Sequence, residues 1–202
     1  MTKTEFAARL QQACASVTAA EQELTEIDSK FGDADHGLTM TKIAGAISGA
    51  VAESDGGIQS MLDDAAMAVM VLNGGSAVPL WNTWLDGMQE NAPDGDEIDT
   101  AGLQAIFARA LEALNEMSSA QVGDKTMMDA LIPASEAVAA YTGDSADELF
   151  DAAAQAAAQG AEATKQYVSK FGRAKSYGTK TIGTPDAGAV SMSWFFQGLA
   201  RE

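Results

Sequence analysis

Apolar residues recur along this chain every three or four positions, which is the spacing of one face of a helix. The alternation of apolar and polar residues that is typical of strands is scarce. In the first helical stretch the apolar positions are Phe6, Leu10, Cys14, Val17, Leu24 and Ile27, before a break at Phe31 and Gly32. Further helices are expected near residues 38–52, 58–72, 78–90, 100–117, 127–141, 146–168 and 189–200. The pattern predicts an all-α fold, a bundle of about eight helices with short connections.

No repeat and no linker-like segment divides the chain, so residues 1–202 are expected to form a single domain. With 47% hydrophobic residues, the chain has enough apolar material for a core. The longest uncharged stretch, residues 65–85, could span a bilayer by its length alone. A turn at residues 73–76 and Pro79 interrupt it. We therefore expect two buried helices around a loop here, and no membrane span.

The charge balance is strongly acidic, with 29 Asp and Glu against 12 Lys and Arg and a formal net charge of −17. Such a surface would repel nucleic acid and anionic membranes, which argues against both as general partners. Cys14 is the only cysteine, so no disulfide can form within the chain, and residues 1–10 show no export segment. A cytoplasmic setting is expected.

The charge is distributed unevenly. Residues 163–185 contain no Asp or Glu, although Lys165, Lys170, Arg173, Lys175 and Lys180 all lie there. The lysines could simply balance acidic residues on neighbouring helices. Arg173 follows a glycine and precedes a turn-rich stretch, where a guanidinium can bind phosphate through two hydrogen bonds.

Three carboxylates, those of Asp28, Asp33 and Asp35, lie within eight residues at the junction of the first two expected helices. Mg²⁺ binds oxygen ligands and commonly uses only a few carboxylates, with water or phosphate completing its coordination. An EF-hand is excluded, because Ala44 stands where its bidentate Glu is required. From the residues alone two interpretations stay open: a divalent metal site, or one capping Asp beside solvated neighbours.

His36 is the only histidine, which excludes a histidine-based triad and a zinc site with several histidines. Its place beside Asp35 favours a ligand contact, and a hydrogen-bonded structural role is the alternative. Two glycine-rich turns, residues 74–76 and 181–188, can offer main-chain N–H groups to phosphate or can be simple caps. A P-loop is absent, because Asp124 separates Gly123 from Lys125. Together these features indicate a nucleotide or polyphosphate site on a helical frame.

Four motifs in this order resemble a known family. They are Asp28 with the run Gly32-Asp33-Ala34-Asp35-His36-Gly37; Gly74-Gly75-Ser76 with Pro79-Leu80; Gly123-Asp124-Lys125-Thr126-Met127; and Gly172-Arg173-Ala174 with Ile182-Gly183, Asp186 and Gly188-Ala189. Over essentially its whole length the chain is similar to the nucleotide-binding L subunit of dihydroxyacetone kinase, called DhaL.

The resemblance implies a barrel of eight amphipathic, antiparallel helices that binds ADP or ATP at one end through two Mg²⁺ ions. The family's metal ligands match Asp28, Asp33 and Asp35. Its nucleotide-contacting positions match His36, Gly37, Leu38, Thr39, Gly75, Ser76, Ala77, Ser118, Met127, Arg173, Asp186, Ala187 and Gly188. Adenine is expected against apolar groups such as Met127, because a polarizable thioether packs well on a flat ring.

The resemblance also implies a kinase subunit, a phosphotransferase that works with partners. A separate K subunit would hold dihydroxyacetone or a related small ketose, and a phosphotransferase-system M subunit would rephosphorylate the bound ADP. No catalytic side chain is assigned in this chain beyond the metal and phosphate ligands. Departures from the family pattern at Val78 and residues 179–184 leave the metal loop and Arg173 unchanged. The alternatives are an ATP-dependent kinase subunit for another small sugar, a nucleotide-binding adaptor without transfer activity, and an acidic protein that binds only divalent ions.

Overall fold

The structure, a computed structural model, describes residues 1–201, and these form nine α-helices and two 3-10 segments. The α-helices are α1 (Lys3–Ala19), α2 (Glu21–Asp28), α3 (His36–Glu53), α4 (Ile58–Met70), α5 (Ala77–Glu90), α6 (Thr100–Met117), α7 (Met128–Ala140), α8 (Ala146–Ala163) and α9 (Ala187–Leu199). The 3-10 segments are η1 (Thr164–Gln166) and η2 (Arg173–Thr181). Within residues 1–201, no helix is long and apolar enough to cross a membrane.

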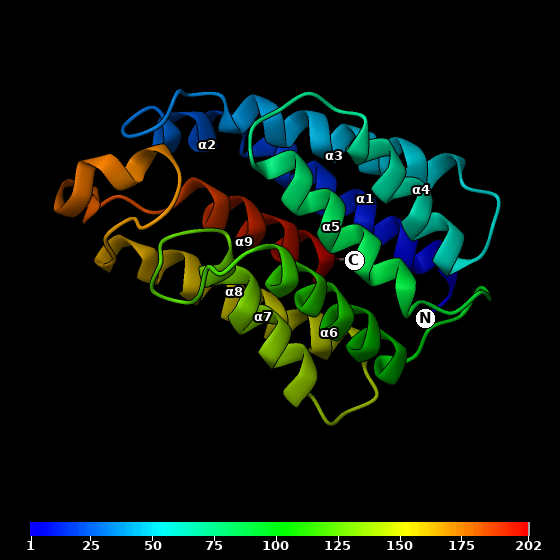
Figure 1. The fold of residues 1–202 in the computed structure, drawn as a ribbon. Helices are drawn as coiled ribbons and strands as arrows, with labels where there is room; N and C mark the ends of the chain where they lie inside the picture. Colours follow the sequence, from blue (N-terminus) through cyan, green and yellow to red (C-terminus); the bar gives the residue numbers. More distant parts are fainter. Residues whose placement is uncertain (202) are drawn as a thin grey trace.

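Eight of the helices form a closed ring (Figure 1). α1 packs on α3, and each helix from α3 to α8 packs on the next one along the chain. α9 packs back on α1 and closes the ring, while α2 lies outside it against α3 and α9. The predicted all-α barrel of eight helices is therefore confirmed.

The ring closes where α1 and α9 cross at Ala13 and Gly198. The two main chains approach so closely that a Cβ on Gly198 would overlap the Cα of Ala13. Arg9 spans the same interface, where it donates a hydrogen bond of 2.8 Å to the carbonyl of Leu199 and lies over the ring of Phe150. A glycine is required at this crossing because any side chain would separate the two helices.

Aromatic side chains from α5, α6 and α9 fill the middle of the barrel. Trp84 is fully buried, and its ring centroid lies 5.5 to 6.2 Å from those of Trp81, Phe107, Phe195 and Phe196. Most of these pairs meet edge to face, the arrangement that the charge distribution of aromatic rings favours. The indole Nε1 of Trp84 is buried without a hydrogen-bond partner. Trp84 is therefore held by packing rather than by a hydrogen bond from its indole.

Two expected helices differ from the structure. The first stretch is not continuous, because α1 ends at Ala19 and the N–H of Ala20 turns to the carbonyls of Val17 and Thr18. α2 then leaves the ring and packs on α3, where Gly37 has no side chain to obstruct Glu21 and Thr25. The helix expected over residues 146–168 ends at Ala163 and continues only as η1.

The connections between helices divide between the two ends of the barrel (Figure 1). Residues 29–35, 71–76, 118–127 and 164–186 meet at the end that carries η2. At the other end, residues 54–57 and 91–99 meet the N-terminus. There the ammonium of Lys3 donates to the carbonyl of Ser54 at 2.7 Å, and the N–H of Ile58 donates to the carbonyl of Gly95 at 2.9 Å.

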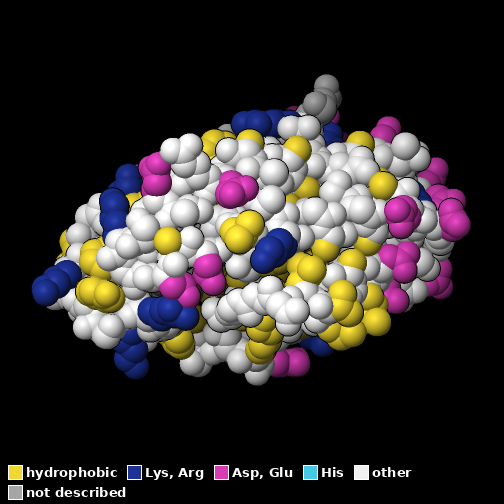
Figure 2. Space-filling view, turned by 90° about the horizontal axis from the view of Figure 1, so that it is seen from above, with side chains coloured by type: hydrophobic (Ala, Val, Ile, Leu, Met, Phe, Trp, Pro, Cys, Tyr) yellow, Lys and Arg dark blue, Asp and Glu magenta, His cyan; other side chains and the backbone are white. Residues whose placement is uncertain are grey.

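Charge also differs between the two ends. In Figure 2 the Lys and Arg side chains gather over the end that carries η2, and Asp and Glu gather over the opposite end. The exposed bases of residues 164–184 are Lys170, Arg173, Lys175 and Lys180, and we call this segment the basic strap. The protein therefore presents a basic end in spite of its net charge of −17.

Candidate functional site

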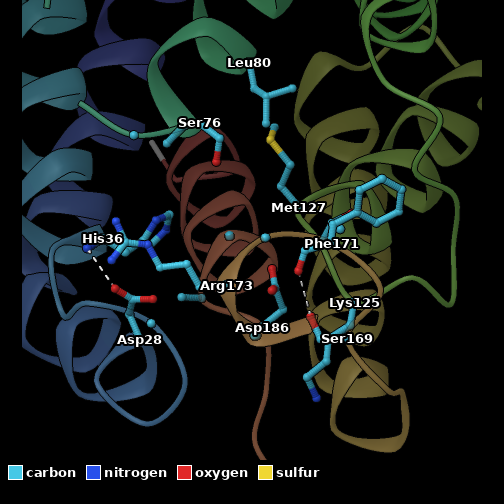
Figure 3. Close-up of a pocket in the computed structure, with 18 of the residues that line it drawn as sticks. Asp28, His36, Ser76, Leu80, Lys125, Met127, Ser169, Phe171, Arg173 and Asp186 are labelled. Carbon is cyan, nitrogen blue, oxygen red and sulfur yellow. Dashed lines mark hydrogen bonds between the residues drawn. The ribbon is translucent and has the colours of Figure 1, made fainter. Parts of the chain in front are cut away.

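A cavity of about 550 Å³ lies at the basic end of the barrel (Figure 3). Its walls are the loop before α3, the turn before α5, the loop between α6 and α7, the basic strap and the start of α9. These segments are far apart in the sequence, and the closed ring of helices brings them together.

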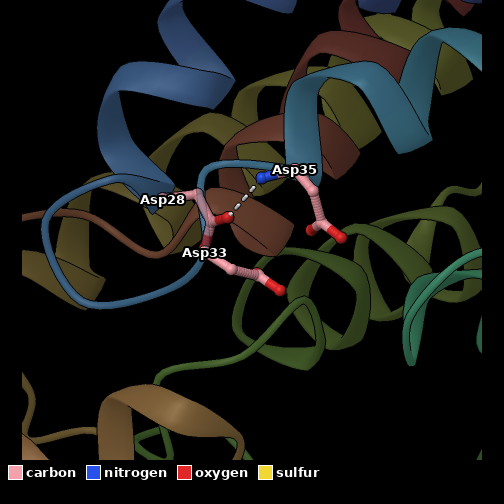
Figure 4. Close-up of side chains that lie close together, drawn as sticks. All are labelled: Asp28, Asp33 and Asp35. Atoms are coloured by element: carbon pink, nitrogen blue, oxygen red, sulfur yellow. Dashed lines mark hydrogen bonds between the residues drawn. The ribbon is translucent and has the colours of Figure 1, made fainter.

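The acidic loop of the cavity brings Asp28, Asp33 and Asp35 together (Figure 4). One carboxylate oxygen from each lies within 4.8 Å of the others. The loop is tightly folded: Ala34 has a left-handed φ of 61°, and a Cβ on Gly32 would overlap the carboxylate of Asp28. Oxygen ligands clustered in this way fit a divalent cation such as Mg²⁺.

The capping alternative applies to Asp28 alone. Oδ2 of Asp28 accepts the main-chain N–H groups of Asp35 at 3.1 Å and His36 at 3.4 Å, at the start of α3. Asp35 is the N-cap residue of α3, but its side chain makes no capping hydrogen bond. Capping therefore does not occupy the carboxylates of Asp33 and Asp35, although that of Asp33 pairs with Arg173.

The electrostatics of the loop also favour a cation. Desolvation raises the pKa of Asp35, and the nearby charges of Asp33 and Asp28 raise it further. The guanidinium of Arg173 opposes this effect, because its Nη2 lies 2.7 Å from Oδ2 of Asp33. An ion between these carboxylates would relieve their mutual repulsion.

His36 has the hydrogen-bonded structural role that the sequence left open, and its place in the cavity wall leaves a ligand contact as a prediction. Its Nε2 lies 3.1 Å from the hydroxyl of Ser191 on α9, so the ring is held by a hydrogen bond. The residue also lines the cavity. Burial lowers the pKa of His36, and the charge of Asp28 opposes this effect, so the neutral imidazole is favoured near pH 7.

The wall formed by α5 offers the positive end of a helix. Ser76 is the N-cap residue of α5, and its side chain makes no capping hydrogen bond. Gly75, Ser76 and Ala77 all line the cavity, and a Cβ on Gly75 would meet nothing within 4 Å. The start of α5 is therefore open to an anion, which the helix dipole would stabilise.

Beside the start of α5 the cavity wall is apolar. Leu80, Met117, Met127 and Phe171 line it, with Ser118 beside them. Figure 3 shows the side chains of Leu80 and Met127 close together, with Phe171 on the same side of the cavity. Such a surface suits a flat apolar group, since thioethers and aromatic rings pack on flat rings.

The floor of the cavity is the start of α9. Asp186 caps this helix by accepting the N–H of Ala189 at 2.8 Å, and its own N–H donates to the hydroxyl of Thr164 at 2.9 Å. Desolvation raises the pKa of Asp186 to about 7, with a further contribution from Asp129 and an opposing one from Lys125. A shift of this size shows that the charged form of Asp186 is destabilised by burial.

Asp186→Asn is expected to stabilise the protein more at pH 7 than at pH 5. The folded pKa of about 7 exceeds the usual 3.8, so the folded chain keeps its proton where the unfolded chain has lost it. Wild-type stability then falls as pH rises through this window, by at most about 1.4 kcal/mol per pH unit, and the amide does not titrate. Urea unfolding of the wild type and the variant at pH 5 and pH 7 measures the gap between their free energies of unfolding. Asp99→Asn, at the exposed N-cap of α6, is the matched control. A gap that does not widen with pH contradicts this prediction.

The cavity collects most of the residues that the sequence singled out. Its lining includes Asp28, Asp33, Asp35, His36, Thr39, Gly75, Ser76, Ala77, Ser118, Met127, Arg173, Asp186, Ala187 and Gly188. Gly37 and Leu38 are not part of this lining. Gly37 is buried against α2, and Leu38 is 50% exposed.

Several lining residues were missed from the sequence, among them Leu80, Lys125, Phe171 and Thr184. Phe171 lies next to Gly172 and Arg173, and this position was a usable signal. Lys125 was considered as part of a P-loop, which this chain lacks, and within the motif of residues 123–127 in the family resemblance, but no role was assigned to it.

The fold and the cavity define a closed α-helical barrel with a carboxylate cluster and a basic segment at one mouth. The chain belongs to the DAK2 domain family, whose sequence profile matches residues 30–201.

The chain is 35% identical over 206 residues to an L-erythrulose kinase of Pectobacterium atrosepticum, covering 96% of this chain and 34% of that kinase. It thus spans about a third of the length of the curated relatives of this kind. It is 29% identical over 182 residues to the ADP-binding subunit DhaL of a PEP-dependent dihydroxyacetone kinase of Listeria innocua, covering 90% of this chain and 87% of that subunit. The expected resemblance to DhaL is confirmed by this match.

The fold is shared with a solved structure. The dihydroxyacetone kinase from C. freundii, crystallised with AMP-PNP and Mg²⁺, superposes with a TM-score of 0.74 at 24% identity. The match covers 96% of this chain and 33% of that one. At this identity the likeness concerns the fold.

Proposed function

We propose that this chain is the nucleotide-binding subunit of a kinase for a small ketose, dihydroxyacetone or a close relative. It would bind ADP or ATP with Mg²⁺ and present the phosphates to a sugar held by another protein. The observation that carries the proposal is the arrangement of the cavity, with three clustered carboxylates, Arg173 and the open start of α5 at one mouth of the barrel.

Different residues of the cavity would hold different parts of such a ligand. Asp28, Asp33 and Asp35 would hold Mg²⁺, and we propose two ions. Bound Mg²⁺ supplies neutralising charge for the phosphates. Arg173 and the start of α5 would bind phosphate oxygens, because both offer N–H donors and positive potential.

The apolar wall would bind adenine. Met127 and Leu80 offer an apolar surface, and Ser118 offers one hydroxyl beside it. The chain's contribution to phosphoryl transfer would be orientation and the exclusion of water, since this reaction needs positioning and charge stabilisation more than covalent chemistry. His36 is held by Ser191, and we assign no general base in the described cavity.

The sugar and the phosphoryl donor belong to partners in this proposal. A separate K subunit would hold dihydroxyacetone, and a phosphotransferase-system M subunit would rephosphorylate ADP, which agrees with the match to PEP-dependent DhaL subunits. The erythrulose kinase relatives support a four-carbon ketose as the alternative acceptor, and the alternative donor we propose is ATP itself. We propose the cytoplasm as the location, where the buried thiol of Cys14 stays reduced.

Native mass spectrometry tests nucleotide binding directly. The purified chain is expected to carry the added mass of ADP with Mg²⁺, and this mass should disappear after treatment with EDTA. Binding of Mg²⁺ without any nucleotide would support the alternative of an ion-binding protein, and it would contradict the proposal.

A reconstituted reaction then tests transfer. The chain is combined with a K subunit and either dihydroxyacetone or erythrulose, with ATP or a phosphorylated M subunit as donor. We expect sugar phosphate from at least one combination at an enzymatic rate. Nucleotide binding without sugar phosphate in any combination would identify a nucleotide-binding adaptor instead.

A further inference from the structure

Lys125 lies in the wall of the cavity and is only 4% exposed. Its ammonium lies within hydrogen-bonding distance of four main-chain carbonyls of the basic strap. The distances from Nζ are 2.7 Å to Thr164, 3.2 Å to Tyr167, 2.8 Å to Thr181 and 2.6 Å to Thr184. Two of these carbonyls lie near the start of the strap and two near its end.

The main chain around Lys125 directs its side chain inward. Lys125 has a left-handed φ of 61°, which is uncommon for a residue with a side chain. Asp129 holds this turn from both sides, because its carboxylate accepts the N–H of Gly123 at 2.6 Å and that of Thr126 at 2.7 Å. Burial lowers the pKa of Lys125, and the charges of Asp186 and Asp129 oppose this effect. A buried ammonium is tolerated here because carbonyl oxygens surround it.

Between the two pairs of carbonyls, the strap consists of residues 168–172 and the 3-10 segment η2, which is kinked at Gly178. Gly172 and Gly178 have positive φ values, and residues 170–173 are exposed. Two contacts join the strap to the acidic loop: the ion pair of Arg173 with Asp33, and the packing of Tyr177 on Phe31 at a centroid distance of 5.2 Å. The position of Arg173 over the cavity therefore depends on these contacts and on how the two ends of the strap are held. The ends also bond to each other, since the N–H of Gly183 donates to the carbonyl of Lys165 at 2.7 Å.

We propose that Lys125 is a positioning residue, which gathers both ends of the basic strap through main-chain carbonyls and so holds Arg173 at the mouth of the cavity. Lys125 would act on the ligand through Arg173. The ligand is the metal-bound nucleotide, and this part of the inference rests on the proposed function. The anchoring of the strap by Lys125 does not depend on the proposed function.

A second lysine offers a matched control. Lys170 lies on the strap and forms an exposed ion pair with Asp124, the residue before Lys125. Exposed ion pairs contribute little to stability. Lys170→Met and Lys125→Met thus remove the same charge from contacts between the same two segments, one at the surface and one in the interior.

Hydrogen exchange of the nucleotide-free protein tests the anchoring. In Lys125→Met, main-chain amides of residues 165–183 are expected to exchange at least about tenfold faster, while those of α5 keep their wild-type rates. Lys170→Met should leave both unchanged. Unchanged exchange in the strap of Lys125→Met, or equal acceleration throughout the barrel, would overturn the proposal.

Calorimetry with Mg·ADP tests whether Lys125 affects nucleotide binding by positioning Arg173. Arg173→Ala and Lys125→Met are each expected to weaken binding about 10- to 100-fold, the worth of a charge-assisted hydrogen bond. The double variant should bind no more weakly than either single variant, because both remove the same interaction. Additive losses would overturn the proposal. If the wild-type chain binds no nucleotide, the proposed function fails, and hydrogen exchange alone decides the anchoring.

Chemical rescue covers the case in which Lys125→Met does not fold. Lys125→Ala is prepared with propylammonium, which supplies the missing methylenes and the ammonium, or with tetramethylammonium, which has the charge but no N–H donor. Recovery of exchange protection in the strap with propylammonium alone is expected. Equal recovery with both cations, or with neither, would contradict anchoring through hydrogen bonds.

Discussion

Asp33→Asn and Asp35→Asn are each expected to raise the Kd for Mg·ADP at least about 100-fold, since loss of even an indirect partner of a metal ligand costs 10- to 100-fold. One carboxylate oxygen of each residue lies within 4.8 Å of the others of the cluster, and neither side chain caps α3. An amide is a weaker ligand for Mg²⁺ and brings no negative charge. Isothermal calorimetry with the nucleotide-free protein measures the change.

The same variants should fold normally, which separates binding from stability. Desolvation is the main cause of the raised pKa of Asp35 and the neighbouring carboxylates add to it, so removing one charge is not expected to lower the melting temperature. The ion pair of Asp33 with the exposed Arg173 contributes little to stability. Asp55→Asn, in the exposed turn between α3 and α4 at the other end of the barrel, makes the same change in charge and should keep wild-type affinity. Unchanged affinity in both loop variants would refute the metal site.

Trp84→Ala is expected to destabilise the protein by about 3–5 kcal/mol, the usual cost of truncating a large buried aromatic residue. The side chain is fully buried and contacts aromatic rings from α5, α6 and α9, so its loss opens a cavity where three helices meet. Urea unfolding followed by circular dichroism measures the free energy of unfolding.

Trp84→Phe distinguishes packing from hydrogen bonding at this position. The indole Nε1 has no partner in the structure, so the smaller ring gives up no hydrogen bond, and much of the edge-to-face packing is retained. We expect Trp84→Phe to lose less than half as much stability as Trp84→Ala. Equal losses in the two variants would contradict this prediction.

The helical architecture could be predicted because the helices bury regular apolar faces. α4, for example, buries Ile58, Met61, Leu62, Ala65 and Val69 at helical spacing, and its turn at residues 73–76 is marked by Asn and Gly. The break at Ala20 had no such signal, since alanine is the best helix former and only the packing of α2 on α3 ends α1 there. The folded path of the basic strap could not be predicted either, because main-chain contacts determine it.

The acidic loop could be predicted because its chemistry lies in side chains that are close in sequence. The contacts of Lys125 could not be predicted from the sequence, since its partners are main-chain carbonyls. Every residue has such a carbonyl, and no sequence motif identifies which ones are used. Gly37 shows the reverse case: it lies beside the loop in sequence, but the structure places it against Glu21 and Thr25 of α2. Position next to a ligand residue does not by itself make a residue part of the cavity wall.

The contact between α1 and α9 also bears on how the protein is made. Every other neighbouring pair in the ring is close in sequence, so these pairs can form while the ribosome is still extending the chain. α1 has to wait for α9, because Gly198, Phe195 and Phe196 lie on α9 and leave the exit tunnel after the other helices of the ring. Until then Trp84 lacks two of its aromatic neighbours, and the nascent barrel exposes an apolar interior to other chains.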